Sequence, residues 1–345
     1  MALRATAGDG AFDALLVLSF GGPEGPEEVM PFLENVTRGR GVPRERLEQV
    51  ARQYMLFGGV SPINDECRKL ISVLEAELQA AGLRLPVYWG NRNWTPLLAD
   101  TVAQMAHDGV TRALAIATSA YSSYSACRQY LDDIDRARAA VGAAAPVIEK
   151  IPPYWNHPGF IETMAASVRA ALEALGDVPR ERTRLVFTAH SIPASMAATC
   201  DYVEELREAS RLVAERAAPA LGWDLVYQSR SGAPGQAWLE PDVRDHLVTL
   251  PPQGVAGVVL VPIGFVADHM EVKFDLDVEA AQVAVRCGLA VSRAACVGAA
   301  PRFVAGLVDI VRARLEGRAP RVLGARGARP WPCKPGCCAY TPGRP

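Results

Sequence analysis

The chain has 345 residues, half of them hydrophobic, which is enough for two domains, or one large one, with a sizeable core. Its 36 basic and 38 acidic residues nearly balance and no Lys/Arg-rich run occurs, so a nucleic-acid surface is not expected. The longest apolar stretches, such as 257–266, are shorter than the ~20 residues that cross a bilayer, and the first residues lack a signal-peptide pattern. These features predict a cytoplasmic protein without a transmembrane segment.

Short aliphatic runs alternate with longer amphipathic stretches along the chain. The aliphatic runs predict strands at 14–20, 85–89, 112–118, 147–150, 185–189, 224–228 and 257–265. The amphipathic stretches predict helices at 65–81, 97–106, 160–175 and 202–218. This alternation indicates an α/β fold in which helices cover both faces of parallel sheets, and ligands of such sheets bind at the carboxyl ends of the strands.

The chain divides into two halves of similar plan. The segment TAHSIP, at 188–193, repeats the plan of the first strand and its loop, and the proline-rich IPPYWNHP, at 151–158, marks a seam between the halves. After about residue 318 the composition shifts to Gly, Arg, Pro and Cys, which is typical of an extended tail. We therefore expect a flexible N-terminus at 1–11, one domain at 12–154, a second at 155–316 and a cysteine-containing tail at 317–345.

A row of acids follows the most apolar strand. Glu271, Asp275 and Glu279 are spaced i, i+4, i+8, so on a helix they form a ladder along one side, and Lys273 is the one base among them. An acidic helix face is most often a solvated surface. This one begins at the carboxyl edge of a sheet, and like charges with little basic compensation favour a bound cation or shared protons. The pattern leaves open both a solvated face and a site for a metal ion or protons.

His190 directly follows an apolar strand and precedes a Ser-Ile-Pro turn. A lone histidine is more often structural than catalytic, but the carboxyl end of a strand favours a site residue that accepts a proton or ligates a metal. The sequence contains no GxGxxG, GxxxxGK[ST] or GxSxG motif. Dinucleotide, ATP and ester-hydrolase functions are therefore not indicated.

Three of the eight cysteines, Cys333, Cys337 and Cys338, cluster in the tail at CxxxCC spacing. This density does not suit core packing, and thiolates are ligands of zinc or iron–sulfur centres. A fourth ligand has to come from elsewhere, and Cys127, at the carboxyl side of a strand, is the best candidate. Free thiols, or a disulfide formed by oxidation in air, are the alternative.

The loops taken together resemble the ferrochelatase family. In chain order they are LLVLSFGGP, FGGVSPIN, GNRNW, SAYSSYSACRQY, TAHSIP, YQSRSG with WLEPD, and GFVADHMEVKFDLDVEA, and the resemblance covers about 14–311. It implies two similar Rossmann-like halves, each a parallel sheet flanked by helices, with a porphyrin in the cleft between them. The tail resembles that of the actinobacterial branch, whose members act on coproporphyrin III and carry a [2Fe–2S] cluster.

The resemblance also implies roles for single residues. The catalytic histidine of the family falls on His190 and its essential glutamate on Glu271, and both would contact the substrate Fe²⁺. Asp275 and Glu279 match acids that continue along a helix with a π-type turn, where they would pass protons out or iron in. No organic cofactor is implied.

Two further groups of residues follow from the resemblance. The [2Fe–2S] cluster would be held by Cys127, Cys333, Cys337 and Cys338. The porphyrin would be bound by residues of the matching loops, namely Ser61, Arg38, Arg40, Arg52, Arg92 and Tyr124 at its propionates and Phe20, Tyr121 and Trp238 at its ring faces.

Two positions depart from the family pattern. Phe20 stands where some relatives have a metal-contacting tyrosine, and a phenyl ring cannot ligate iron. Asn93 replaces a histidine that some relatives have nearby. The departures leave metal contact to His190 and Glu271.

The implied activity is insertion of Fe²⁺ into coproporphyrin III, which gives coprohaem in haem biosynthesis. A protoporphyrin IX ferrochelatase that gives haem b, and a porphyrin or metal carrier without turnover, are the alternatives. Insertion of Co²⁺ into sirohydrochlorin is disfavoured because those relatives use a different histidine pattern. The expected partners are the two substrates and, transiently, neighbouring enzymes of the haem pathway.

Overall fold

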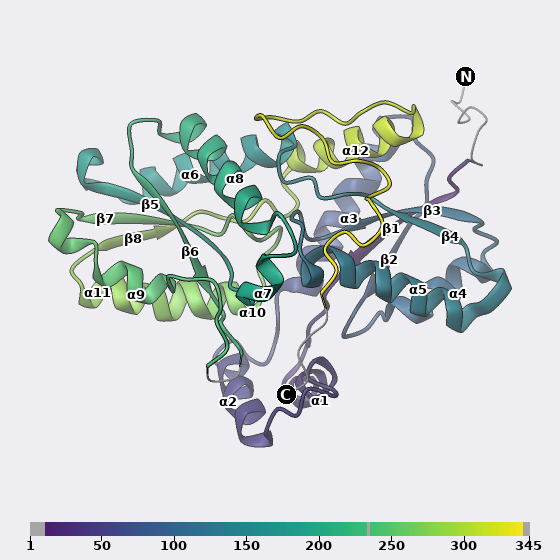
Figure 1. Ribbon diagram of the computed structural model, residues 1–345, viewed down its shortest axis with the longest axis horizontal. Helices are drawn as coiled ribbons and strands as arrows, with labels where there is room; N and C mark the ends of the chain where they lie inside the picture. Colours follow the sequence, from purple (N-terminus) through teal and green to yellow (C-terminus); the bar gives the residue numbers. More distant parts are fainter. Residues whose placement is uncertain (1–10, 233–234, 341–345) are drawn as a thin grey trace.

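The computed structural model describes residues 11–232 and 235–340, so the expected flexible N-terminus at 1–11 falls almost wholly outside the described part. The described residues form two four-stranded sheets in which every strand pairs in parallel with its neighbours. Helices cover both faces of each sheet (Figure 1). The expected α/β fold with two similar parallel sheets is confirmed.

The two sheets repeat one strand order. The first sheet has the order β2-β1-β3-β4 and consists of β1 (Ala14–Ser19), β2 (Val87–Asn91), β3 (Arg112–Ala117) and β4 (Val147–Lys150). The second has the order β6-β5-β7-β8 and consists of β5 (Thr183–His190), β6 (Trp223–Gln228), β7 (Gly257–Val261) and β8 (Ala290–Arg293). In each sheet the first strand of the half therefore lies in the interior, where it is buried on both faces and apolar.

The helices follow the strands in both halves. The helices before residue 150 are α1 (Pro26–Val36), α2 (Arg44–Met55), α3 (Ile63–Ala80), α4 (Leu98–His107), the π-helix η1 (Tyr124–Arg128), α5 (Gln129–Val141) and the 3₁₀ turn η2 (Gly142–Ala144). Those after it are α6 (Pro158–Ala174), η3 (Arg180–Arg182), α7 (Ala194–Ala197), α8 (Tyr202–Ala217), α9 (Val243–Val248), η4 (Pro251–Gln253), α10 (Met270–Val272), the π-helix η5 (Lys273–Ala280), α11 (Ala281–Arg286) and α12 (Pro301–Leu315). No helix among the described residues is long and apolar enough to span a membrane.

One hydrophobic core runs through both halves. It contains buried residues of β1 and β3 from the first sheet and of β5 and β7 from the second, joined through α3, α6, α8 and α12. Helix α12 is the link, because it packs against α6 and also against α3 of the first half (Figure 1). Phe303 of α12 is 1% exposed and its ring lies 6.2 Å from Tyr154 and 6.1 Å from Phe160. The last helix among the described residues thus completes the packing of the first half.

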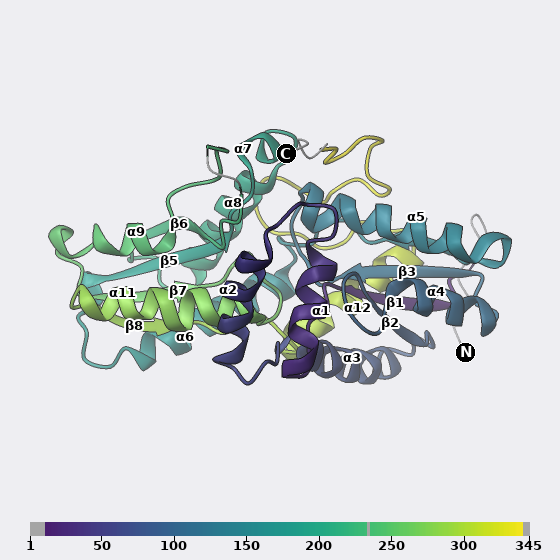
Figure 2. The ribbon, with the colours of Figure 1, turned by 90° about the horizontal axis from the view of Figure 1, so that it is seen from below.

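Helices α1 and α2 form a separate pair that lies across the boundary between the two sheets (Figure 2). Their facing residues make a small core of their own, which includes Phe32 and Tyr54. Met270, at the start of α10 in the second half, is buried in the same core. The pair therefore contacts the segment that carries the acidic row.

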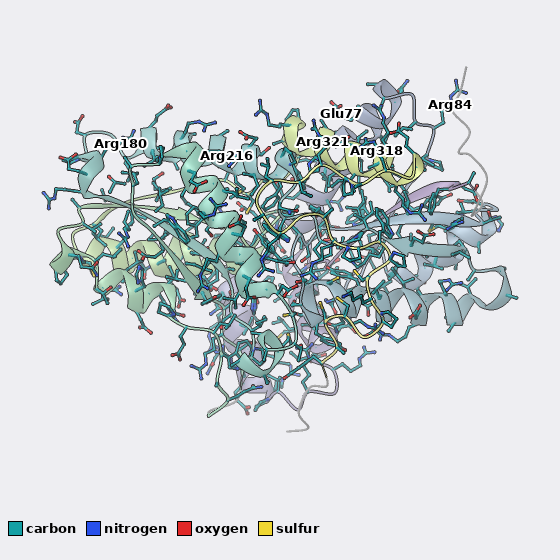
Figure 3. All side chains as sticks on the ribbon, turned by 45° about the horizontal axis from the view of Figure 1, so that its top comes forward. Glu77, Arg84, Arg180, Arg216, Arg318 and Arg321 are labelled. Atoms are coloured by element: carbon teal, nitrogen blue, oxygen red, sulfur yellow. The ribbon has the colours of Figure 1, made fainter. Side chains whose placement is uncertain are left out.

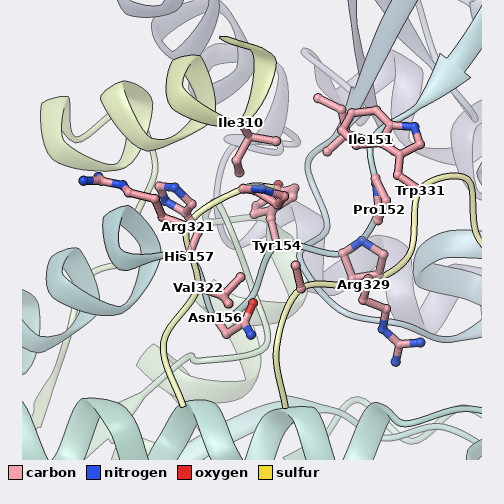
Figure 4. A pocket seen from close by; sticks show the side chains of 13 residues that line it. Ile151, Pro152, Tyr154, Asn156, His157, Ile310, Arg321, Val322, Arg329 and Trp331 are labelled. Atoms are coloured by element: carbon pink, nitrogen blue, oxygen red, sulfur yellow. The ribbon is translucent and has the colours of Figure 1, made fainter. Parts of the chain in front are cut away.

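The described part of the tail after α12 runs over the surface without helix or strand and is tied to the second half. The Leu323 amide donates to the Asn156 carbonyl at 2.9 Å, and Arg318 pairs with Asp309 of α12 at 2.8 Å. Figure 3 shows Arg318 and Arg321 beside that helix, and Arg321 also reaches Asp309, at 3.1 Å. Beneath the tail lies a cavity of about 20 Å³, room for about one water molecule (Figure 4).

Candidate active site

His190 is the last residue of β5, and hydrogen bonds hold its ring and its backbone in place. Nδ1 donates to the carbonyl oxygen of Ser191, which assigns the hydrogen to that nitrogen. The Tyr202 hydroxyl donates to the His190 carbonyl oxygen at 3.0 Å and holds the backbone at the end of the strand. Nε2 is therefore the ring nitrogen that faces the site.

Glu271 approaches His190 from the loop and helix that follow β7. The Glu271 amide donates to Nδ1 of His269 at 3.2 Å, so His269 caps the start of α10 and is not part of the acidic row. Oε2 of Glu271 lies 3.4 Å from Nε2 of His190. The structure thus brings together the two residues that the sequence singled out for metal contact, although they are 81 positions apart.

The His190–Glu271 pair holds opposite charges. Burial lowers the pKa of His190, but the negative charge and hydrogen bond of Glu271 outweigh burial and raise that pKa to about 9. Burial raises the pKa of Glu271, and the positive charge of His190 reverses this and lowers that pKa to about 2. At neutral pH the pair is an imidazolium and a carboxylate, which share one exchangeable proton.

Asp275 follows Glu271 along the continuous helical segment 270–286, within η5. Ser229 Oγ donates to its carboxylate, and Gln228 Nε2 lies 3.4 Å from the same oxygen. Burial and the charges of Glu271 and Glu279 raise the pKa of Asp275 to about 7, against the lowering effect of Ser229. Asp275 therefore exchanges a proton readily near neutral pH.

Glu279 ends the row at the surface, where it has a basic partner that the sequence pattern did not reveal. Arg244 Nη1 lies 3.0 Å from Glu279, and the same guanidinium is held by Asp242 at 2.9 Å. The expectation of little basic compensation around the acids was therefore wrong at this end. Arg244 is 35 positions away in sequence, and only the fold brings it to Glu279.

The other two acids of the stretch belong to a different face. Asp268 and Asp277 both pair with Arg293 of β8, and Asp268 lies 2.8 Å from it. Lys273 also pairs with Asp277, at 2.7 Å. The acidic stretch thus splits into a neutralised face toward β8 and the row of Glu271, Asp275 and Glu279.

Residues of the first half also lie near the His190–Glu271 pair. Phe20, which follows β1, is half-exposed and packs edge-on against Phe32 at 6.4 Å. The charge of Glu271 contributes, after burial, to a raised pKa of Tyr54 on α2, so this hydroxyl lies near the pair. The Tyr121 hydroxyl, after β3, donates to the Ile263 carbonyl, after β7, at 3.0 Å. The carboxyl edges of the two sheets therefore face each other.

The residues expected to bind porphyrin fall into an exposed and a buried group. Arg38, Arg40 and Arg52 are exposed at or near α1 and α2, and Tyr124 and Trp238 are partly exposed. Ser61 is buried in a turn, where its amide donates to the Pro23 carbonyl at 2.8 Å.

Tyr121 is also buried, and Arg92 is mostly buried. The Arg92 side chain is 9% exposed, lies over the Tyr130 ring, and pairs with Asp133 at 2.6 Å. Tyr121 is 1% exposed inside the core, and its contact with a ring face stays a prediction.

The four cysteines of the predicted cluster come close together. Sγ of Cys337 lies 3.5 Å from Sγ of Cys338, and Cys127 and Cys338 are both buried. Burial, and then the nearby Cys127 and Cys337, raise the pKa of Cys333 to about 11, so these thiols are neighbours. Within the described residues, however, no group of three or more His, Cys, Asp or Glu side chains is arranged to hold a metal ion. The cysteines share one region without forming a ligand set, and the cluster stays a prediction.

Paired parallel sheets with acids and a histidine at their facing carboxyl edges define a chelatase-type α/β protein. Two solved structures of the chelatase SirB from Bacillus subtilis share the fold. The one in complex with cobalt has a TM-score of 0.53 and 10% identity and covers 88% of this chain and 95% of its own. The one with Fe³⁺ has a TM-score of 0.51 and 13% identity and covers 87% of this chain and 94% of its own.

Sequence similarity is more specific than the fold. Residues 12–315 match the ferrochelatase family, and the chain belongs to this family. The coproporphyrin III ferrochelatase of Nocardia farcinica is 54% identical over 95% of this chain and 97% of its own. The ferrochelatase of Rhodopirellula baltica is 52% identical over 97% of this chain and 95% of its own. The coproporphyrin III ferrochelatase of Mycolicibacterium smegmatis is 51% identical over 95% of this chain and 100% of its own.

Proposed function

We propose that the protein inserts Fe²⁺ into coproporphyrin III and so forms coprohaem, as a cytoplasmic enzyme of haem biosynthesis. The observation that carries the proposal is the His190–Glu271 pair, 3.4 Å apart, with a row of acids leading away from it. The names and the high identity of the Nocardia farcinica and Mycolicibacterium smegmatis relatives support the choice of porphyrin.

The pair suits the chemistry of metal insertion. Metallation removes two protons from pyrrole nitrogens and strips water from Fe²⁺. Nε2 of His190 and the Glu271 carboxylate offer one nitrogen and one oxygen ligand, or one base each after the shared proton has left. Because the resting pair already holds a proton, iron and proton compete for the same atoms, and iron binding releases that proton.

The remaining acids of the row give that proton a route. Asp275, with its pKa near 7, accepts and releases protons at physiological pH, and Glu279 lies at the surface beside Arg244. A negatively charged row also attracts a divalent cation from solution. We propose that iron enters or protons leave along Glu279 and Asp275.

We propose that the porphyrin lies between the halves 12–154 and 155–316, where the sheet edges face each other. Exposed Arg38, Arg52 and Phe20 and partly exposed Tyr124 and Trp238 are accessible to it, whereas contact with Ser61 or Arg92 requires those buried side chains to open. Transient contact with neighbouring enzymes of the haem pathway remains part of the proposal.

Anaerobic metallation of coproporphyrin III, followed through the Soret band, tests the activity. We expect turnover by the wild type, and a loss of at least ~100-fold in His190→Ala and in Glu271→Gln because each removes half of the pair. Asp277→Asn is the matched control, since Asp277 is on the same helix but faces Arg293, and it should keep turnover near that of the wild type. Porphyrin binding without turnover by the wild type would instead identify a carrier.

The substrate is tested by comparing coproporphyrin III with protoporphyrin IX under identical conditions. Coproporphyrin has four propionates and protoporphyrin two, so binding sites for four anionic groups should favour the first. Faster turnover of protoporphyrin IX would overturn the proposed substrate and leave the ferrochelatase activity intact.

We further propose a [2Fe–2S] cluster held by Cys127, Cys333, Cys337 and Cys338. The proximity of the four thiols supports it, because thiolates are the ligands of such clusters. Freshly purified protein should show visible absorption and contain iron and acid-labile sulfide, and Cys338→Ser should lose both. Cys200→Ser is the control, because Cys200 lies near Cys338 but outside the proposed set. Colourless protein with stoichiometric zinc would contradict the cluster.

A further inference from the structure

A buried carboxylate outside the acidic row holds the loop that follows β3. Glu205 of α8 is 1% exposed. Its Oε2 accepts from the backbone amide of Ser122 at 2.7 Å and from the Ser122 hydroxyl at 2.8 Å. Glu205 belongs to the second half and Ser122 to the first, so this contact joins the halves beside the candidate site.

The charge that balances Glu205 comes from the tail. Arg329 Nε donates to Oε1 of Glu205 at 2.9 Å, and Nη2 donates to the Ser122 hydroxyl at 2.8 Å and to Asp201 at 2.6 Å. Figure 4 shows the Arg329 guanidinium pointing away from the small cavity under the tail. Glu205, Ser122 and Arg329 thus form a closed triangle with one member each from the second half, the first half and the tail.

Ser122 is directly joined to the segment that faces the substrate. The next residue, Ser123, caps η1 by accepting from the Ala126 amide at 2.9 Å, and η1 begins with Tyr124. Further along the tail, the Tyr340 ring lies 6.0 Å from the Tyr124 ring, and its hydroxyl lies 3.5 Å from that of Ser195 on α7. The tail therefore touches η1 through Tyr340 and the loop just before η1 through Arg329, and Arg329 makes the buried contact.

We propose that Arg329 is a positioning residue which, through buried Glu205, fixes the loop 118–123 and the start of η1 in the geometry that binds the porphyrin. The inference rests on the proposed function, because Tyr124 is proposed there as a porphyrin contact. It makes docking of the tail a condition for the shape of the substrate site, independently of any metal bound by the cysteines.

Electrostatics gives the reason that Arg329 has this effect. A buried carboxylate that loses its partner is left as an uncompensated charge, which is far more costly than removal of both partners. Without Arg329, Glu205 is driven to take up a proton or water, because burial already raises its pKa. Either change weakens its hold on the Ser122 amide and loosens the loop.

The test compares Arg329→Met with Arg326→Met in the full-length protein. Methionine keeps the unbranched stem and removes the charge. Arg326 is a tail arginine whose ion pair with half-exposed Asp201 is long, at 3.9 Å. For Arg329→Met we expect the KM for coproporphyrin III to rise roughly tenfold, about 1.4 kcal/mol, with kcat within about twofold of the wild type. We expect faster hydrogen–deuterium exchange in 118–128, and neither change in Arg326→Met.

A second mutation separates positioning from general damage. In the double variant Glu205→Gln with Arg329→Met no buried charge is left unpaired, so KM should return toward the wild-type value. If Arg329→Met does not fold, the double variant should fold, and its failure to do so would overturn the proposal.

Equal KM and equal exchange in Arg329→Met and Arg326→Met would also overturn the proposal. If the wild type has no turnover but its segment 118–128 is protected from hydrogen–deuterium exchange, the result counts against the proposed function alone. The difference in exchange between the two variants can be measured without turnover.

Discussion

Asp275 is the residue of the acidic row whose surroundings are least favourable to charge. Its carboxylate lies between those of Glu271 and Glu279 and is partly buried, while Ser229 provides the main hydrogen bond. Ser229 itself has a left-handed backbone, with φ of 61°, which is uncommon outside glycine. The local chain thus adopts an unfavourable conformation where it supports a carboxylate that titrates near pH 7.

Asp275→Asn should make stability less dependent on pH. The pKa of Asp275 is about 7 in the folded protein, whereas an aspartate free of such surroundings has a pKa of 3.8, so the folded state favours the protonated form. The wild type therefore loses stability as pH rises from about 4 to about 7, and the variant does not. The measurement is the melting temperature of the metal-free variant minus that of the metal-free wild type. We expect this difference to be larger at pH 8 than at pH 4 by on the order of 3 °C. An equal difference at both pH values would contradict the assigned pKa.

The ion-pair partners of the acids show which features could not be predicted from the sequence. The acidic row and His190 could be identified because their signals are local, a spacing of four and a place at the end of a strand. Arg244 and Arg293, which neutralise Glu279 and the Asp268–Asp277 face, carry no local signal, because their partners are 35, 25 and 16 positions away. The burial of Arg92 was unpredictable for the same reason, since it depends on Asp133, 41 positions along.

At the level of elements, buried parallel strands were the most predictable feature. All seven predicted strands are present with starts within two residues of the expected ones, because continuous apolar runs are needed where both sheet faces are covered. The strand predicted at 257–265 ends earlier, at Val261, since Pro262 begins the loop. Strand β8 escaped prediction because its four residues, AVSR, are all partly exposed and half of them polar.

The segment 270–286 keeps the three regularly spaced acids on one helical stretch. It runs as α10, the π-helix η5 and α11 without interruption, and the row continues along it. A π-helical segment changes the side-chain direction of successive turns, and it is costly unless function or packing retains it. The sequence pattern predicted a ladder, while its π-helical form was expected only from the family resemblance.

At the level of the whole molecule, the shared core predicts that the halves unfold together. Phe303→Ala would empty a buried site between α12, α6 and the seam, at a cost of roughly 3–5 kcal/mol. We expect one calorimetric transition at a lower temperature, with exchange protection reduced in both sheets. Val285→Ala is the control, because Val285 is 70% exposed, and its transition should stay near that of the wild type. Two separated transitions in Phe303→Ala would refute the common core.

The position of α12 has a consequence for synthesis of the chain. Helix α3 is complete at Ala80, but the helix that covers it begins at Pro301. At ~5–20 residues per second the ribosome makes the intervening segment in on the order of 10–40 s. Throughout that time the nascent first half lacks one wall of its core and exposes apolar surface of α3. Folding of the first half is therefore completed only after nearly the whole second half has been made, and chaperone contact during translation should concentrate on that uncovered face.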